Sequence, residues 1–583
     1  TPITWHQNLM TKFAKYLPAL TWLKNYQGAD LKSDTVASIV FTIMVIPQSL
    51  AYAMLAGLPA ITGLYASILP SILYSLFGTS RTLAVGPVAL TSVMTASAVL
   101  PFAVSGSEQY ATVAILLAFM SGVFLLVLSL LRLGFLTNLL SHPVISGFIS
   151  ASALLIVIGQ LKYLLGIQSE GDTLLPLVHS LYLHVNNINL PTFILSLASI
   201  TSLLLMRRYF STLLKSLGCS AQAIQLFGKS GPVLVVVAAT VAVALLSLEN
   251  MGVSIIGNVP IKPLGINMEG INWKIVEELL PSAFLISIVG FIGSVSVAQS
   301  FAAKRRQDID PNQELVGLGL ANIGSAMCGA FPVTGGFSRT VLNADCGSKS
   351  PMTGIISALL ILLTLLFLTP LFYYLPKAIL ASIISISMMQ LVSVQDLRNL
   401  WRFSKKEASL LIITFSVVMI EGMETGLIVG VILSILCFLW HTSHPHIAIV
   451  GRLPGTEHFR NVQRFTVETH PSILTVRIDE NLFFANARVF EERLQSLVSQ
   501  NTAVKHLILM CTAVNMIDAS ALQSLEKIVD RLADSDVKLH LSEVKGPVMD
   551  RLKDSKLLDN LTGQVFLTQY QAIQALEDKQ TKS

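Results

Sequence analysis

The sequence predicts an all-α polytopic membrane domain followed by a small α/β domain. Hydrophobic residues make up 53% of the 583 residues and charged residues only 13%, whereas a soluble protein carries roughly 25% charged residues. About fourteen apolar stretches, of or near the length that crosses a bilayer, lie within 34–442. Strand-like and helix-like patterns alternate after them. We therefore expect an amino-terminal segment (1–33), a membrane domain (34–442) and an α/β domain (443–583).

The amino-terminal segment is polar and basic, and it contains Lys12, Lys15, Lys24 and Lys32. Short segments rich in Lys and Arg beside membrane helices stay on the cytoplasmic side. With this end inside, the basic loops around 207–215, 304–306 and 398–406 also face the cytoplasm, and the last short loop outside carries Glu421 and Glu424. An even number of crossings then places the carboxyl-terminal domain in the cytoplasm as well.

Two of the apolar stretches are short and interrupted by Gly and Pro. One follows Ala84–Pro87 and the other follows Thr334–Gly336. They are the third stretch of the first seven and the third stretch of the second seven. Broken segments at matching positions of two halves are typical of transporters built from inverted repeats. The sequence thus predicts a 7+7 inverted repeat, and two coincidental kinks are the alternative.

Arg339 directly follows the second of these breaks. A cation at bilayer depth is costly, rare and usually functional. Irregular backbone at that depth is tolerated only where it is buried in protein or lines a watery cavity. The starts of two half-helices present free N–H groups and positive dipole ends, which attract anions. The combination predicts a binding site for a small anion.

The last 140 or so residues read as a small α/β domain. Strands are expected at Ile473–Ile478 and Val504–Met510. Amphipathic helices are expected at Ala519–Leu532, Pro547–Leu552 and Tyr570–Leu576. No apolar run in this part is long enough to cross a membrane.

Four runs, taken in their order and spacing, resemble the sulfate permease (SulP) family of anion transporters. They are Pro47–Ala53, Val85–Pro87, Asp310–Leu315 and Gly335–Arg339. Two further runs, Asn481–Asn486 and Ile517–Leu522, resemble the STAS domain that this family carries. The resemblance implies that segments one to four and eight to eleven form a core and the others a gate. It also implies a homodimer in which the core moves against the gate like an elevator.

The resemblance and the helix-dipole argument place the same residues at the anion. The expected substrate-binding residues are Gln48, Tyr52, Gly86, Val88, Ala89, Gly336, Phe337, Ser338 and Arg339. Ser338 is expected to donate a hydrogen bond to the anion, and Arg339 to supply positive potential. Gln48 and Tyr52 are four residues apart and share a helix face. Hydrogen bonding between helices is the alternative role for these two.

Two positions are assigned from the resemblance alone. Many relatives have a carboxylate where Gly293 stands, and the family links that carboxylate with proton or cation coupling. Since this chain has glycine at that position, three alternatives follow. Other groups couple transport to protons or cations, or the transporter is uncoupled, or the chain is a variant altered at this position. The run Asp518–Ser520 resembles the phosphorylated loop of bacterial STAS regulators, so Ser520 is a candidate regulatory residue. Its alternative role is simply to open a helix.

The expected function is secondary active transport of a small inorganic anion, with sulfate as the first candidate. The alternatives are a bicarbonate or dicarboxylate transporter, an anion channel or exchanger without proton coupling, and a sensor working through the STAS domain. The expected partners are the anion, the lipid bilayer and a second copy of the chain. The expected location is the inner (plasma) membrane, as in bacterial members of the family.

Other classes of function find no support in the sequence. There is no nucleophile–base set and no nucleotide-binding loop, so we expect neither an enzyme nor a cofactor. The net charge of +5 is dispersed over loops, unlike a nucleic-acid-binding surface. His441, His444 and His446 are expected to form a solvated linker rather than a metal site.

Overall fold

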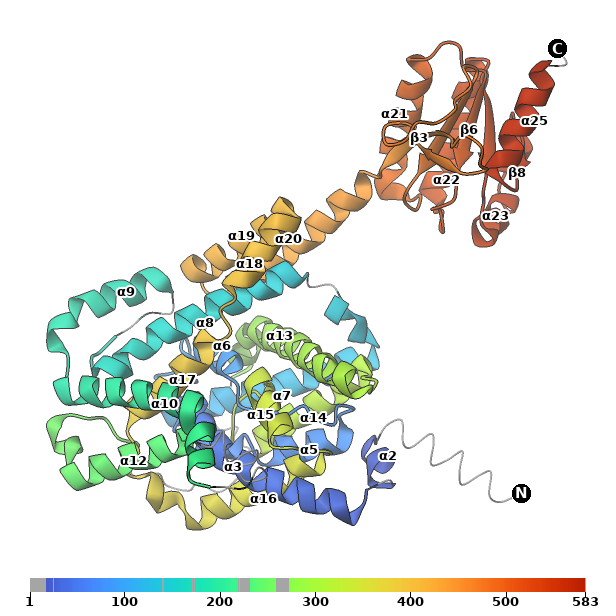
Figure 1. The fold of residues 1–583 in the computed structure, drawn as a ribbon. Helices are drawn as coiled ribbons and strands as arrows, with labels where there is room; N and C mark the ends of the chain where they lie inside the picture. The colour runs from blue at the N-terminus through green and yellow to red at the C-terminus, as the bar shows by residue number, and fades with distance from the viewer. Residues whose placement is uncertain are drawn as a thin grey trace, which may run out of the picture. The chain divides into compact units, whose positions relative to one another are not determined.

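The computed structural model describes residues 17–24, 26–138, 141–169, 171, 173–218, 220, 231–257 and 272–581 (Figure 1). Lys12 and Lys15, two of the lysines in the predicted cytoplasmic segment, lie outside the described residues. The chain divides into two compact units, Thr1–Ser434 and Ile435–Ser583. The first unit is helical, and the second contains a six-stranded sheet.

The described part of the chain up to Ser443 supplies two successive sets of helical segments, the last of which extends past the end of the first unit. The first set is α3 (Gly28–Leu55), α4 (Thr62–Tyr65) with α5 (Leu69–Phe77), α6 (Ala89–Val99), α7 (Glu108–Leu130), α8 (His142–Leu165), α10 (Leu190–Ser216) and α12 (Gly231–Leu246). The second set is α13 (Trp273–Arg305), α14 (Pro311–Met327), α15 (Phe337–Asp345), α16 (Met352–Phe367), α17 (Lys377–Met389), α19 (Lys405–Glu421) and α20 (Met423–Ser443). Seven helices among the described residues are long and apolar enough to cross a membrane.

Shorter helices connect these segments. They are α2 (Ala19–Lys24), η1 (Leu133–Asn138), α9 (Leu174–Leu183), η2 (Val185–Asn187), η3 (Leu248–Met251), η4 (Thr369–Phe372) and α18 (Val394–Phe403).

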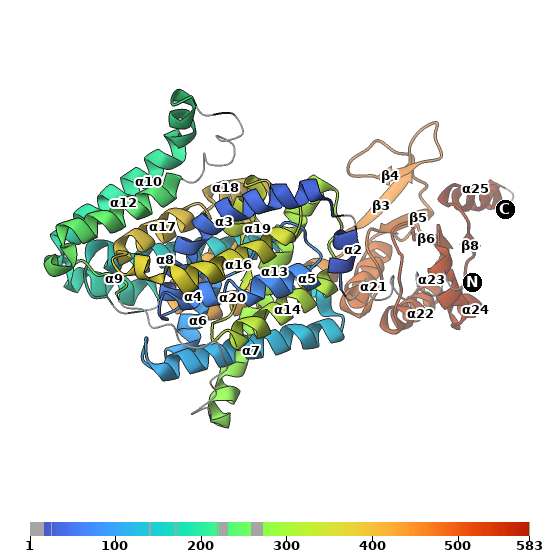
Figure 2. The same cartoon turned by 90° about the horizontal axis from the view of Figure 1, so that it is seen from below.

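The same helix contacts are found when each helix is replaced by its counterpart in the other set. Helix α3 packs against α16, and their counterparts α13 and α7 pack against each other. Likewise α7 packs against α14 while α16 packs against α5, and α8 packs against α19 while α17 packs against α10. Figures 1 and 2 both show α3 and α16 side by side. The same packing scheme is therefore built twice, as the predicted repeat requires.

The start of α14 shows how local chemistry sets helix boundaries. Pro311 occupies the first helical turn, where its missing N–H group costs nothing. The Asp310 side chain accepts hydrogen bonds from the N–H groups of Asn312 and Gln313, at 2.9 and 3.4 Å. Asp310 therefore caps α14 and satisfies two donors that would otherwise lack partners.

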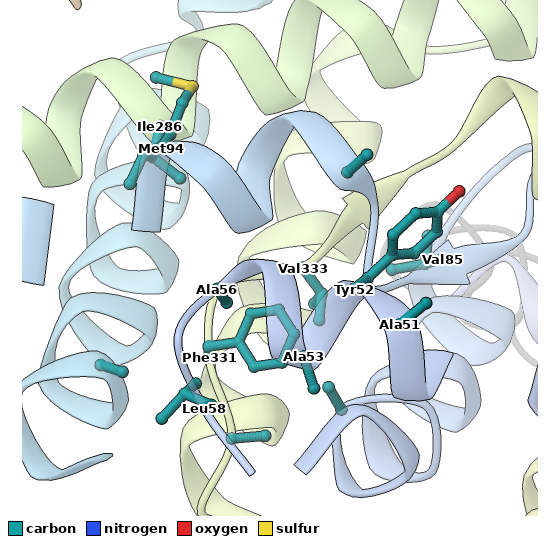
Figure 3. Close-up of a cluster of buried hydrophobic side chains, with 14 of the residues drawn as sticks. Ala51, Tyr52, Ala53, Ala56, Leu58, Val85, Met94, Ile286, Phe331 and Val333 are labelled. Carbon is teal, nitrogen blue, oxygen red and sulfur yellow. The ribbon is translucent and has the colours of Figure 1, made fainter. Parts of the chain in front are cut away.

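The core of the first unit joins residues from both sets of helices. Figure 3 shows Phe331 and Val333 beside residues of α3 such as Ala53. Met94 of α6 and Ile286 of α13 belong to the same buried cluster. Val85 of the first break and Phe331 and Val333 before the second break are buried in this one cluster, so packing between the two sets of helices holds both breaks in place.

The second unit has an α/β fold with strand order β4-β3-β5-β6-β7-β8. Strands β5 to β8 run parallel, whereas β3 pairs antiparallel with both β4 and β5. The strands are β3 (Ile447–Arg452), β4 (Phe459–Asn461), β5 (Ile473–Ile478), β6 (His506–Met510), β7 (Lys538–Ser542) and β8 (Val565–Phe566). The helices are α21 (Phe484–Ser499), α22 (Ala519–Asp534), α23 (Gly546–Lys553), α24 (Leu557–Asn560) and α25 (Gln569–Thr581).

Both predicted strands and all three predicted helices of this unit are present. The second strand begins at His506 instead of Val504. The N–H groups of Lys505 and His506 both donate to the backbone carbonyl of Ser472, and pairing with the neighbouring strand starts only from there. Strands β3, β4, β7 and β8 and helices α21 and α24 were not predicted. The edge strands β4 and β8 are short. In α21 the buried residues Ala487, Phe490, Leu494 and Leu497 recur at helical spacing, so the signal for this helix was present in the sequence.

Candidate functional site

The two broken segments meet and pair with each other. Strand β1 (Val85–Gly86) runs antiparallel to β2 (Thr334–Gly335), with Val85 opposite Gly335 and Gly86 opposite Thr334. Helix α6 starts three residues after β1, and α15 starts two residues after β2. This short sheet therefore holds the amino-terminal ends of two half-helices together, although about 250 residues separate them in sequence.

Neither half-helix receives a side-chain cap. Val88 precedes α6 and Gly336 precedes α15, and no side chain caps the N–H groups of either first turn. A Cβ atom at Gly336 would lie 2.8 Å from Cγ2 of Val88, so the two capping positions face each other. Uncapped starts leave N–H groups available and concentrate the positive ends of two helix dipoles in one place.

The Arg339 side chain lies behind this junction and is 2% exposed. Its Nη1 lies 3.2 Å from the carbonyl oxygen of Pro87, to which it donates. Nη1 also lies 3.5 Å from Oγ of Ser49, and Nη2 lies 3.3 Å from Oγ of Ser67. The guanidinium is thus held by the first half of the chain, and its charge lies beside the start of α6.

Phe337 and Ser338 form the first turn of α15. Phe337 is 53% exposed, and its ring centroid lies 6.5 Å from that of Phe301 on α13. Ser338 is half-buried. Ala89 of α6 is fully buried, so α6 contributes backbone at this point. The first turn of α15 is therefore partly accessible at Phe337 and Ser338.

Gln48 and Tyr52 lie on α3, which packs against both α6 and α15. Tyr52 is 2% exposed (Figure 3), and its hydroxyl interacts with Ser387 of α17. Gln48 is half-buried, and its Oε1 atom has no hydrogen-bond partner among the described residues. Tyr52 therefore connects the half-helix region to α17, whereas Gln48 keeps an unused polar atom.

Gly293 lies on α13 in open surroundings. A Cβ atom built there would meet no atom within 4 Å. The adjacent Ser294 accepts from the N–H of Gly335 at 2.8 Å, and its Oγ lies 2.6 Å from Oγ1 of Thr334. Gly293 is thus next to residues that hold β2, and a longer side chain at this position would have room.

Sequence reasoning missed the residues that position the breaks. Glu314 on α14 is fully buried. Its carboxylate accepts from the Tyr74 hydroxyl at 2.6 Å and from the hydroxyl and N–H of Thr79 at 2.6 and 2.7 Å. These bonds fix the loop that leads into β1. The signal was present, since a carboxylate in a membrane segment is as exceptional as a cation.

Asn322 does the same for the second break. Its amide accepts from the N–H of Val333 and donates to the Val333 carbonyl, both at 2.9 Å. Ser49, Ser67, Ser294 and Thr334 were missed because small hydroxyl residues are common in membrane helices. Nothing in the sequence distinguishes these four from the others.

The remaining candidates lie in the second unit. Ser520 is exposed in the first turn of α22, while Asp518 caps that helix by accepting from the N–H of Ala521 at 2.8 Å. His446 contacts Asp479 at 2.8 Å. Within the described part of the chain, no group of three or more His, Cys, Asp or Glu residues is arranged to hold a metal ion.

Comparison with known proteins agrees with this architecture. Residues 31–414 match the model of the sulfate permease family, and residues 464–572 match that of the STAS domain. Sulfate transporter 4.1 of Arabidopsis thaliana, a chloroplastic protein, is 35% identical over 90% of this chain and 77% of its own length. A probable sulfate transporter of Mycobacterium tuberculosis is 31% identical over 96% of this chain and 98% of its own length.

Solved structures share the fold. SLC26A9 superposes with a TM-score of 0.87 at 22% identity, covering 99% of this chain and 95% of that one. The transmembrane domain of the cyanobacterial bicarbonate transporter BicA gives 0.59 at 21% identity, covering 70% of this chain and 98% of that one. By its sequence match, the chain belongs to the sulfate permease family.

Proposed function

We propose that the protein is a secondary transporter of small inorganic anions, with sulfate as its main substrate. The observation that carries the proposal is the junction of two uncapped helix starts beside the buried cation Arg339. Backbone N–H groups, dipole ends and a cation together provide what a small oxyanion needs in place of water. Relatives that cover most of this chain are named sulfate transporters.

The anion would lie between the first turns of α6 and α15. Its backbone contacts would come from Gly86, Val88 and Ala89 on one side and from Phe337 on the other. Gly336, whose N–H donates to the Ala84 carbonyl at 3.3 Å, would allow close approach of the anion. Ser338 would donate a hydrogen bond, and Arg339 would act through its potential without direct contact. Gln48 would face the same space, which would give its unpaired Oε1 atom a solvated environment.

Transport would require α6 and α15 to move relative to α17. The Tyr52–Ser387 interaction lies where such sliding would occur, between predicted core and gate elements. We propose an elevator-type movement in a homodimer in the cell inner membrane, with the amino-terminal segment (1–33) and the STAS domain (443–583) in the cytoplasm. The basic loops support this orientation through the positive-inside rule.

A second candidate is anion exchange without proton coupling. The observation that favours it is Gly293, which provides no titratable group at the open position beside β2. Bicarbonate or a dicarboxylate would be the alternative substrate.

Uptake by purified protein in proteoliposomes tests these proposals. We expect saturable uptake of radiolabelled sulfate that unlabelled sulfate competes away. Competition by bicarbonate or by succinate shows which of these anions the protein also accepts. Preloading the proteoliposomes with sulfate distinguishes exchange from net uptake. Uptake that fails to saturate would indicate a channel, and the absence of sulfate uptake and exchange would exclude the proposal.

A further inference from the structure

Arg339 is a buried cation whose neighbours are all neutral. No ion pair among the described residues includes it. Its side chain contacts the Ser49 and Ser67 hydroxyls and the Pro87 carbonyl. Its Nε atom is buried without a hydrogen-bond partner in the described part of the chain. Buried charges in proteins are normally paired, so this arrangement is costly.

The hydroxyl groups near Arg339 can donate their protons in only one arrangement. Ser67 donates its single proton to the carbonyl of Gly63 at 2.9 Å. The Ser49–Ser67 contact of 3.1 Å must then use the proton of Ser49, because a hydroxyl has only one proton to donate. Both oxygens consequently turn lone pairs toward the guanidinium, which can only donate. Each of the two serines is fully buried, so water does not replace them.

We infer that Ser49 and Ser67 are positioning residues that hold Arg339 by neutral acceptors so that its charge stays available to the anion. A carboxylate at either place would fix the side chain better but would cancel its potential. The bound anion would then be the counter-charge that the folded protein lacks. The role given to the anion rests on the proposed function. The neutral surroundings of Arg339 do not depend on which substrate the protein carries.

The test compares Ser67→Asp with Ser67→Asn, two side chains of nearly equal size that differ in charge. Ser49→Asp and Ser49→Asn form a second pair in case the first does not fold. Binding of sulfate and of nitrate to the purified full-length protein is measured by isothermal titration calorimetry. Thermal unfolding is measured without anion, so that one readout does not depend on transport or binding.

We expect the Asp variants to bind sulfate about tenfold or more weakly than the matched Asn variants. The loss should be larger for divalent sulfate than for monovalent nitrate, a difference that a merely structural role would not produce. Without anion, each Asp variant should melt at or above its Asn partner, because the new carboxylate would pair with Arg339.

Two results would overturn the inference. One is equal affinity in the Asp and Asn variants, which would mean that the charge of Arg339 does not act on the anion. The other is an Asp variant that melts well below its Asn partner, as expected for a buried carboxylate without a cation beside it. Failure of the wild-type protein to bind sulfate would instead count against the proposed function, and the melting comparison would still decide whether Arg339 is unpaired.

Discussion

The guanidinium of Arg339 lies directly against the backbone of Gly86. A Cβ atom built at Gly86 would be 2.4 Å from Nη1 and 2.6 Å from Cζ of Arg339. Glycine is therefore required in β1 for the cation to approach the start of α6. From the sequence, Gly86 is expected to be a substrate-binding residue. The structure shows that the group packed against its backbone is the guanidinium of Arg339.

Gly86→Ala should displace the guanidinium and weaken sulfate binding about tenfold. The new methyl group clashes with the tip of a flexible side chain, so folding should be little affected. Sulfate affinity and melting temperature of the purified protein check this. Gly159→Ala on α8 is the control, because no atom lies within 4 Å of a Cβ at that glycine. Equal effects of the two substitutions would contradict the assignment.

Arg339→Ala should lower sulfate affinity by at least about tenfold without lowering the melting temperature. The substitution removes a buried charge that has no ion-pair partner in the described structure, so it also removes a desolvation cost. Arg339→Lys keeps the charge but cannot reach Ser49 and Ser67 with two nitrogens. We expect its affinity to lie between those of wild type and Arg339→Ala. Wild-type uptake kinetics in Arg339→Ala would show that the cation is not used.

Ser338→Ala should cost about 0.5–1.5 kcal/mol of sulfate binding, the net value of one hydrogen bond. Ser338→Leu should block binding, because its side chain would fill the space in front of α15. Tracer binding in detergent measures both effects. Ser300→Ala on α13 is the control, since its hydroxyl bonds to Ser296 within the helix. Similar losses in the two Ser338 variants would speak against direct contact.

Gly293→Glu should introduce pH-dependent uptake between about pH 5 and 8, where carboxylates in such sites titrate. The open space at Gly293 accommodates the side chain. Gly293→Gln, which has the same size and no titratable group, should leave uptake independent of pH. Sulfate flux into proteoliposomes at matched internal and external pH provides the measurement. Strong proton-driven accumulation by the unaltered chain with Gly293 would show that another group performs the coupling.

Asp479→Asn should destabilise strand β5 near neutral pH by roughly 0.2–1 kcal/mol, as expected for a partly exposed ion pair. Burial alone would raise the pKa of Asp479, but hydrogen bonds from Arg477 and His446 outweigh it and hold the pKa below its ordinary value. The stabilisation is therefore present above the unfolded pKa of about 3.9 and is lost as the pH falls through the folded pKa.

Hydrogen exchange of β5 amides in the full-length protein measures this effect. The difference between wild type and Asp479→Asn should shrink as the pH is lowered below about 4. Glu492→Gln is the control, because the Arg488–Glu492 pair is exposed, with side chains 89% and 63% accessible. A constant difference at every pH would mean that the carboxylate charge is not involved.

The sequence alone determined the architecture and the positions of the two breaks. Gly and Pro at the two breaks, and a cation beside one of them, follow directly from local backbone chemistry and from the cost of charge in a bilayer. The long apolar stretches likewise indicate membrane-spanning helices, because each helix satisfies its own backbone hydrogen bonds. The pairing of Val85 with Gly335 puts both breaks at one place, as the sequence predicts.

Only the tertiary structure decided what each side chain near the site contacts. Ser49 and Ser67 are about 290 and 270 residues before Arg339, and Glu314 fixes a loop some 235 residues earlier. Short polar side chains carry no periodic signal, and their partners depend on how helices from the two halves pack. The sequence could therefore place a cation beside the second break, whereas packing decided that neutral groups hold it.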